Sequence, residues 1–278
     1  MLNEEIRRPE SLAAVVAERI RRAILQTEVK LGEALSEDRI ASALGVSRTP
    51  VREAFTMLQL QGLITVVPQR GSFVFLPSDS ELAELCEYRR MIEIQGAAQS
   101  MRWQAYAAGQ QLQEAHAAMV EAQRTRDALG FAAADSLFHE AFLNHCENRY
   151  LQEAYALASV RLAAVRSHLA APLLLDEAEV VAEHEAILRA FLDADLAELD
   201  RLLGIHIVRM CAFYARAIRD ELLAVGRGAN AAPKSRWRVR PLEGAPGRQS
   251  RRRSASQPQT GQRRSRSGRG PKETLGCT

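Results

Sequence analysis

Three histidines and one aspartate stand where the helical pattern of the chain calls for hydrophobic residues. Asp135 and His139 are four residues apart, so a helix would carry both side chains on one face, about 5–6 Å apart at Cβ. His184 and His206 each fall on the apolar stripe of a later predicted helix. An unpaired polar group in a core costs on the order of 1–3 kcal/mol. Four such groups converging from three helices would satisfy one another through a cation; the alternative is that each histidine separately hydrogen-bonds a backbone carbonyl.

A second set of residues suited to binding surrounds a glycine turn near the N-terminus. Ile40 and Leu44 give the segment before Gly45 one apolar face, and Pro50 fits the first turn of the helix that follows, because that position needs no amide donor. Two helices joined in this way form a helix-turn-helix, whose second helix can lie in the major groove of DNA. The side chains expected to contact base edges and adjacent phosphates are Ser47, Arg48, Thr49 and Arg52.

The stretch after this helix predicts a β-hairpin wing. Gly62 ends the helix, residues 63–67 are rich in β-branched residues as strands are, and residues 72–75 form the returning strand. The hairpin places Arg70 and Gly71 at its tip, near the minor groove or the DNA backbone. A helical hairpin that packs on another protein is the alternative, but it leaves these arginines unexplained.

These residues resemble the N-terminal domain of GntR-family transcription regulators. The resemblance covers about residues 11–75 and rests on Leu-Gly-Val-Ser-Arg-Thr-Pro-Val-Arg-Glu-Ala at 44–54, Gly-Leu-Ile at 62–64 and Pro-x-Arg-Gly-x-Phe-Val at 68–74. It implies a homodimer that places two recognition helices on a two-fold related operator in double-stranded DNA. Asp38 stands where many FadR-type members carry an arginine, so a different half-site is expected.

The elements that must position the aspartate and the histidines are helices. From about residue 80 to residue 225 the chain is rich in alanine and leucine and shows no strand-like alternation. Six helices of this length make an antiparallel bundle. Their predicted ranges are 80–108, 110–128, 131–146, 149–170, 177–193 and 195–224.

This helical region resembles the FCD effector domain of FadR-type GntR regulators over about residues 80–222. The resemblance implies a divalent metal ion (zinc, nickel, manganese or iron) with positions open to a small organic acid effector. Arg89 would bind a second carboxylate of the effector; an ion pair between Arg89 and Glu93 is the alternative, and Arg161 and Arg166 are weaker candidates. The shared residues are Tyr88-Arg89-x3-Glu93, Asn148-x2-Leu151, and the implied metal ligands Asp135, His139, His184 (after Glu183) and His206.

Charge divides the chain into an acidic part and a basic tail. The net charge of 278 residues is +3, but residues 227–278 hold 14 basic and 2 acidic residues, which leaves 23 basic and 32 acidic residues in 1–226. DNA affinity must therefore come from locally placed arginines. We expect a mainly α protein with four parts: a flexible arm (1–10), a winged helix-turn-helix (11–76), an effector-binding and dimerisation domain (77–225) and a disordered basic tail (226–278).

Cysteine usage and hydropathy favour a cytoplasmic protein with no membrane partner. The four cysteines, at 86, 146, 211 and 277, show no close pairing and no metal-type spacing, as is typical of reduced thiols. No apolar run approaches the ~20 residues that a membrane helix needs. The predicted function is a ligand-responsive transcriptional repressor and not an enzyme. The alternatives are a metal-dependent hydrolase fused to a DNA-binding domain, which lacks a His-Glu-x-x-His motif here, and a constitutive repressor with a structural metal.

Overall fold

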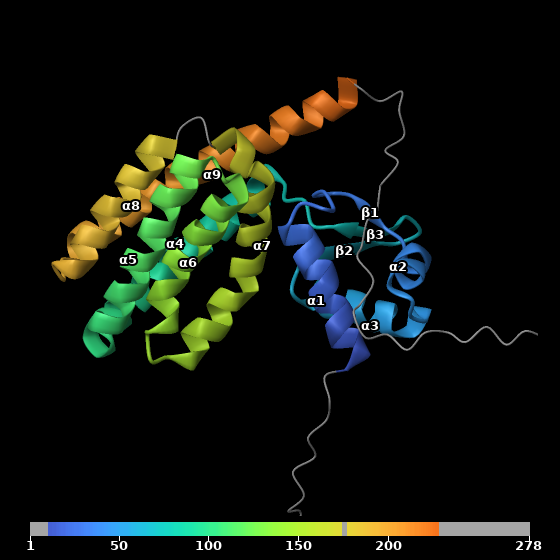
Figure 1. Ribbon diagram of the computed structural model, residues 1–278, viewed down its shortest axis with the longest axis horizontal. Coiled ribbons are helices and arrows are strands. Elements are labelled where there is room, and N and C mark those ends of the chain that lie inside the picture. Colours follow the sequence, from blue (N-terminus) through green and yellow to red (C-terminus); the bar gives the residue numbers. More distant parts are fainter. Residues whose placement is uncertain (1–10, 174–176, 228–278) are drawn as a thin grey trace, which may run out of the picture. The chain divides into compact units, whose positions relative to one another are not determined.

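The computed structural model describes residues 11–173 and 177–227 (Figure 1). The expected N-terminal arm and nearly all of the expected basic tail lie outside the described residues. The rest is mainly helical, with a small sheet near the N-terminus, and this confirms the predicted fold class. No helix within the described ranges is both long and apolar enough to cross a membrane.

Three helices and a three-stranded sheet form the winged helix-turn-helix. The strand order is β1-β3-β2, and both pairs are antiparallel. The first strand is a finding of the structure, because two residues are too few to give an alternating pattern in the sequence. The elements are α1 (Leu12–Leu25), β1 (Ala34–Leu35), α2 (Glu37–Leu44), α3 (Arg48–Leu60), β2 (Ile64–Val67) and β3 (Gly71–Val74).

Local chemistry explains the turn between α2 and α3. The Ser36 hydroxyl accepts a hydrogen bond from the backbone N–H of Arg39 and caps α2, and Gly45 ends it with a left-handed φ of 69°. Val51 and Leu58, on the inner face of α3, are fully buried. Leu60, two residues after the buried Leu58, is 77% exposed, because residues two apart on a helix face different directions.

Six helices form the bundle, and neighbouring helices pack alongside one another (Figure 1). The expected single helix over 80–108 is divided at Gln104, whose φ of −141° lies outside the helical region. A capping box between Ser78 and Glu81 starts the first of them. Their bounds are α4 (Asp79–Trp103), α5 (Ala105–Thr125), α6 (Ala128–Asn144), α7 (Arg149–Leu173), α8 (Glu177–Leu192) and α9 (Leu196–Arg227).

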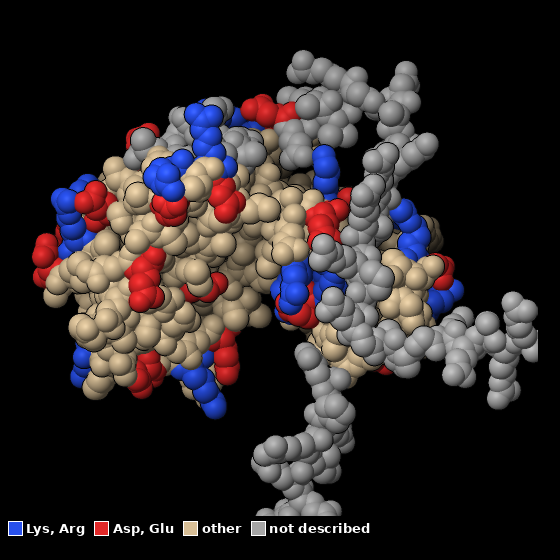
Figure 2. Space-filling view, viewed as in Figure 1, with Lys and Arg blue, Asp and Glu red and all other residues tan. Residues whose placement is uncertain are grey.

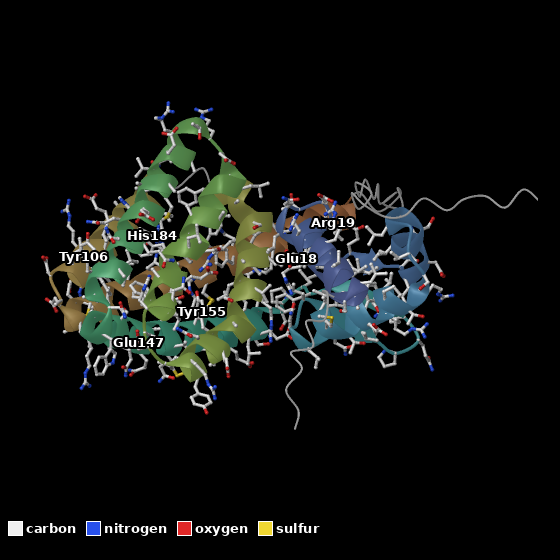
Figure 3. All side chains as sticks on the ribbon, turned by 60° about the horizontal axis from the view of Figure 1, so that its bottom comes forward. Glu18, Arg19, Tyr106, Glu147, Tyr155 and His184 are labelled. Carbon is white, nitrogen blue, oxygen red and sulfur yellow. The ribbon has the colours of Figure 1, made fainter. Side chains whose placement is uncertain are left out.

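The apolar core of the bundle surrounds a group of buried polar side chains. Phe138 and Phe142 of α6 and Phe191 of α8 are part of the apolar packing. Figure 3 shows His184 and Tyr155 among the bundle helices, whereas Tyr106 projects outward. Burying so many polar groups is costly unless each finds a partner. The buried polar and charged residues are Arg89, Glu93, Ser100, Asp135, His139, Arg166, His184 and His206.

Candidate functional site

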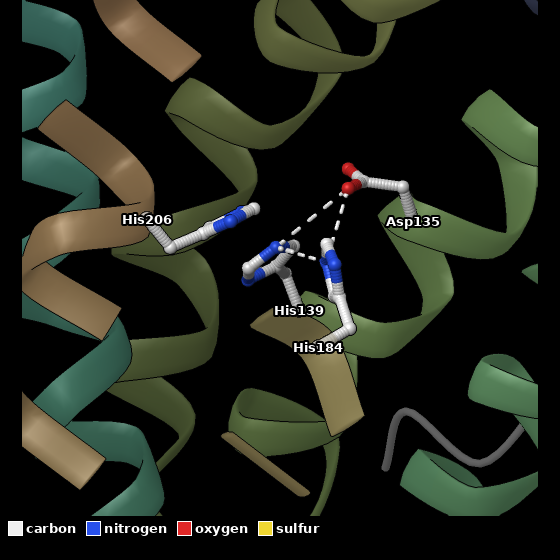
Figure 4. Close-up of side chains that lie close together, drawn as sticks. All are labelled: Asp135, His139, His184 and His206. Atoms are coloured by element: carbon white, nitrogen blue, oxygen red, sulfur yellow. Dashed lines mark hydrogen bonds and ion pairs between the residues drawn. The ribbon is translucent and has the colours of Figure 1, made fainter. Parts of the chain in front are cut away.

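The four side chains predicted to bind a metal lie together inside the bundle (Figure 4). One candidate ligand atom from each of Asp135, His139, His184 and His206 lies within 4.8 Å of the others, and all four residues are buried. His184 Nε2 is 3.2 Å from Asp135 Oδ1 and 3.3 Å from His139 Nε2. Helices α6, α8 and α9 therefore bring a carboxylate and three imidazoles to one point.

The outer nitrogen of each imidazole faces a hydrogen-bond acceptor. An acceptor oxygen at each Nδ1 favours the tautomer that carries its proton there, and this tautomer directs the Nε2 lone pairs toward the shared centre. This arrangement is typical of metal-binding histidines, whose second nitrogen donates to a carboxylate or a backbone carbonyl. The three pairs, each 2.8 Å long, are His139 Nδ1 to Glu93 Oε2, His206 Nδ1 to Glu183 Oε2 and His184 Nδ1 to the carbonyl oxygen of Val180.

The inner nitrogens fit a cation better than they fit one another. His139 Nε2 and His184 Nε2 both present lone pairs in this tautomer, so their close approach is repulsive without a positive species between them. His206 Nε2 is buried and has no hydrogen-bond partner among the described residues. Imidazole and carboxylate donors suit zinc, nickel, manganese or iron. The donor set present therefore fits the divalent metal that the sequence predicts.

Burial and neighbouring charges set the protonation state of this cluster. Burial lowers the pKa of His139 well below its usual value, and Arg89 adds to this effect. Burial followed by His184 lowers the pKa of His206 to about 4. Burial alone would raise the pKa of Asp135, but the Arg166 guanidinium beside it outweighs burial and holds the pKa well below the usual value. At neutral pH His139 and His206 are therefore uncharged and Asp135 is a carboxylate, which are the forms that bind metal.

The metal-free protein is expected to lose stability as the pH falls from 6.5 toward 4. The pKa of His206 is 6.5 in an unfolded chain and about 4 in the folded protein. In this interval the unfolded chain binds more protons, so the free energy of unfolding decreases with decreasing pH, by on the order of 3 kcal/mol for such a group. Urea unfolding of chelator-treated protein over this range measures the effect. A His206→Gln variant should show a shallower dependence; an unchanged dependence would contradict this assignment.

Two buried arginines flank the cluster. Arg89 Nε donates to Glu93 Oε1 at 2.6 Å, so the intrahelical ion pair considered from the sequence is present. Arg166 Nε lies 2.5 Å from Asp135 Oδ2, and its Nη1 donates to Ser136 Oγ at 3.1 Å. Arg89 Nη2 and Arg166 Nη2 are buried without a hydrogen-bond partner among the described residues. These two N–H groups are available to an anion, which guanidinium groups bind well.

Two contacts were not predicted from the sequence: Glu93 orients a histidine, and Arg166 pairs with Asp135. Glu93 accepts hydrogen bonds from Arg89, His139 and Tyr155, the last at 3.1 Å. A signal for Arg166 existed, because it is a charged residue among the apolar positions of α7. The partner of each residue, however, comes from another helix, and a sequence pattern does not show which helices face each other.

The residues predicted to contact DNA lie exposed on the winged helix-turn-helix. Ser47, Arg48, Thr49 and Arg52 lie at the start of α3, and Arg70 and Gly71 lie where β2 turns into β3. Two of them have acidic neighbours on α2, as follows: Arg52 Nη2 is 3.2 Å from Glu37 Oε2, and Arg48 Nε is 3.0 Å from Asp38 Oδ1.

Surface charge gives no other obvious nucleic-acid site on the face shown in Figure 2. Basic and acidic side chains alternate over the described part of that face, and neither sign forms a continuous patch there. This agrees with the expectation that a small number of well-placed arginines provide the DNA affinity.

A winged helix-turn-helix followed by an all-helical domain with a buried histidine cluster defines a class of DNA-binding transcriptional regulators. The family model described as "Bacterial regulatory proteins, gntR family" matches residues 12–74, and the FCD domain model matches residues 84–209. The chain belongs to the GntR family and has the FadR-type architecture, in which an FCD domain follows the DNA-binding domain.

Relatives are similar over both parts of the chain. An uncharacterized HTH-type transcriptional regulator from Agrobacterium vitis is 36% identical over 129 residues, which cover 45% of this chain and 74% of the relative. The "Probable D-xylose utilization operon transcriptional repressor" of Paenarthrobacter nicotinovorans is 29% identical over 191 residues, covering 68% and 83%. A crystal structure of a GntR regulator from Rhodococcus sp. RHA1 superposes with a TM-score of 0.65 at 25% identity, covering 73% and 96%.

Proposed function

We propose that this regulator is a repressor whose affinity for operator DNA depends on a small organic acid bound at a metal in the FCD domain. The observation that carries the proposal is the convergence of three Nε2 lone pairs and one carboxylate beside two arginines with unpaired N–H groups. Cation-binding and anion-binding groups are thus adjacent in one buried place. An organic acid that coordinates the cation through a carboxylate would use both.

The metal ligands in this proposal are Asp135, His139, His184 and His206. A bound divalent ion would supply Lewis-acid positions for an effector carboxylate. Glu93 and Glu183 hold two of the imidazoles in the tautomer that the metal requires.

Arg89 is the proposed partner for a further anionic group of the effector. Its Nε is committed to Glu93, but its Nη2 is unpaired and buried. A buried guanidinium N–H without an acceptor is costly, so an anion that supplies the acceptor gains binding energy from the same group. An effector with a carboxylate and a second acidic or hydroxyl group fits this arrangement.

DNA binding is proposed to use a homodimer and the residues at the start of α3. Ser47, Arg48, Thr49 and Arg52 would contact base edges and phosphates, while Arg70 and Gly71 would lie near the minor groove or backbone. Residues 11–76 would bind DNA, and residues 77–225 would bind the effector and form the dimer. The effector can change operator affinity only as far as its own affinity differs between the two arrangements of the dimer.

The test is a titration of operator duplex with the full-length protein. Duplexes from the region upstream of its own gene are labelled, and fluorescence anisotropy is measured with metal-loaded and chelator-treated protein against a panel of small organic acids. We expect at least one acid to change the dissociation constant by about 5–150-fold, and only when metal is present.

Matched variants separate the alternatives. Arg89→Met should weaken the response to the acid, while Arg124→Ala, an exposed arginine of α5, should leave it unchanged. An acid response that survives complete metal removal would contradict the proposal. Tight operator binding that no acid alters would favour a constitutive repressor with a structural metal, and acid turnover by the loaded protein would favour the hydrolase.

A further inference from the structure

Two cysteines far apart in the sequence lie next to each other in the bundle. Cys86 belongs to α4 and Cys211 to α9, and these helices pack directly against one another. The Cys211 thiol donates to the carbonyl oxygen of Leu82, one turn before Cys86, with a separation of 3.9 Å. Cys86 and Cys211 also line the same surface groove. The sequence, which shows no close cysteine pairing, gave no indication of this contact.

A surface groove gives access to this thiol pair. The groove has a volume of about 470 Å³ and is lined by both cysteines and by apolar residues that include Ile207 and Val208. Cys86 is only 4% exposed, whereas Cys211 is partly exposed. A small reagent that enters the groove would therefore meet Cys211 first.

We propose that Cys86 and Cys211 are a thiol-oxidation site, in which a small peroxide oxidises the two thiols to a disulfide between them. In the first step the Cys211 thiolate attacks one oxygen of hydrogen peroxide, the O–O bond breaks, and the leaving hydroxide takes up the thiol proton as water, which leaves a sulfenic acid on Cys211. In the second step the Cys86 sulfur attacks the Cys211 sulfur, and hydroxide leaves with the Cys86 proton as a second water. Two thiols are oxidised and one peroxide is reduced.

The environment of Cys86 supports this order of events. Burial, followed by the neighbouring Cys211, raises the pKa of the Cys86 thiol to about 12. A raised pKa makes Cys86 a slow nucleophile, so attack on the peroxide falls to the more exposed Cys211. Cys86 lies in the same groove as the sulfenic acid that forms, and this proximity suits it to the second step. The resulting bond would join α4, which carries Arg89 and Glu93, to α9, which carries His206.

Peptide mapping of the full-length protein tests the proposal. A Cys146→Ser, Cys277→Ser variant removes the other two cysteines; it is treated with hydrogen peroxide, alkylated under denaturing conditions and digested with trypsin. We expect a linked pair of peptides, residues 71–89 and 210–216, whose mass is that of the two peptides less two hydrogen atoms, and which separates on reduction. Recovery of both peptides in alkylated form would overturn the proposal, and so would a link between two copies of 210–216.

Single-cysteine variants test the order of attack. With Cys86→Ser, the sulfenic acid on Cys211 should persist and be trapped by dimedone. With Cys211→Ser, Cys86 should react at least tenfold more slowly than Cys211 does in the first variant. Equal reactivity of the two thiols in these folded variants would refute the assignment of Cys211 as the attacking residue.

Discussion

Replacing His184 and His206 together by alanine is expected to abolish stoichiometric metal binding. The double variant keeps only Asp135 and His139 of the four converging donors, and both come from α6. Two ligands from one helix cannot close a site that three helices build, so affinity should fall far below that of wild type. Elemental analysis of protein purified in parallel with wild type, and competition with a chromophoric chelator, measure the loss.

Histidines outside the cluster provide the matched control. His116 Nε2 lies 3.4 Å from the carbonyl oxygen of Val181, and His145 Nε2 lies 2.9 Å from Gln111 Oε1. The His116→Ala, His145→Ala variant should retain its metal. A Glu93→Gln variant keeps an acceptor for His139 Nδ1 but loses its charge, and about 10–100-fold weaker binding is expected. A full metal complement in the His184 and His206 double variant would show that the ligands are misassigned.

The single variants Arg48→Ala and Arg52→Ala should each weaken specific operator binding by about 1–3 kcal/mol while leaving the fold intact. Both side chains are well exposed, at 60% and 68%, so their removal leaves no cavity. A bidentate contact to a base or a charge-assisted contact to a phosphate is what each variant would lose. Anisotropy titrations with operator and with a scrambled duplex, at one fixed salt concentration, distinguish base contacts from phosphate contacts.

Two further variants control for charge alone. Arg124→Ala removes one exposed positive charge from α5, a helix of the bundle, and should leave operator affinity unchanged. Asp38→Ala removes the carboxylate that pairs with Arg48 and should preserve or increase the affinity. If Arg48→Ala and Arg52→Ala bind operator as wild type does, α3 is not the recognition helix as assigned.

Much of the fold could be predicted because its signals are local. Gly45 and Pro50 indicate a helix-turn-helix. The β-branched run at 63–67 and the returning strand at 72–75 indicate a wing, and all these residues are close to one another in the chain. The break at Gln104 could not be predicted, because glutamine is a good helix former and the change of direction follows from packing.

The candidate site likewise has a part that the sequence predicts and a part that it does not. Asp135 and His139 share a face by their spacing, and a histidine on an apolar stripe stands out in any helix. The contacts from Arg166 to Asp135 and from Glu93 to His139 join different helices, and so does the approach of Cys86 to Cys211. These pairs depend on which helices face each other, and amphipathic patterns alone do not determine that.

The carboxylates of Glu37 and Asp38 have a consequence for how the protein searches DNA. In the free protein they already occupy the two arginines that would meet the double helix. Any duplex must therefore displace an internal competitor, and a sequence that offers only phosphates gains little from the exchange, since solvent-exposed ion pairs are each worth about 0–1 kcal/mol. A site that also offers matching base edges gains more. If Arg48 and Arg52 contact DNA as proposed, the acidic start of α2 would shorten the time that the regulator spends on unrelated sequence.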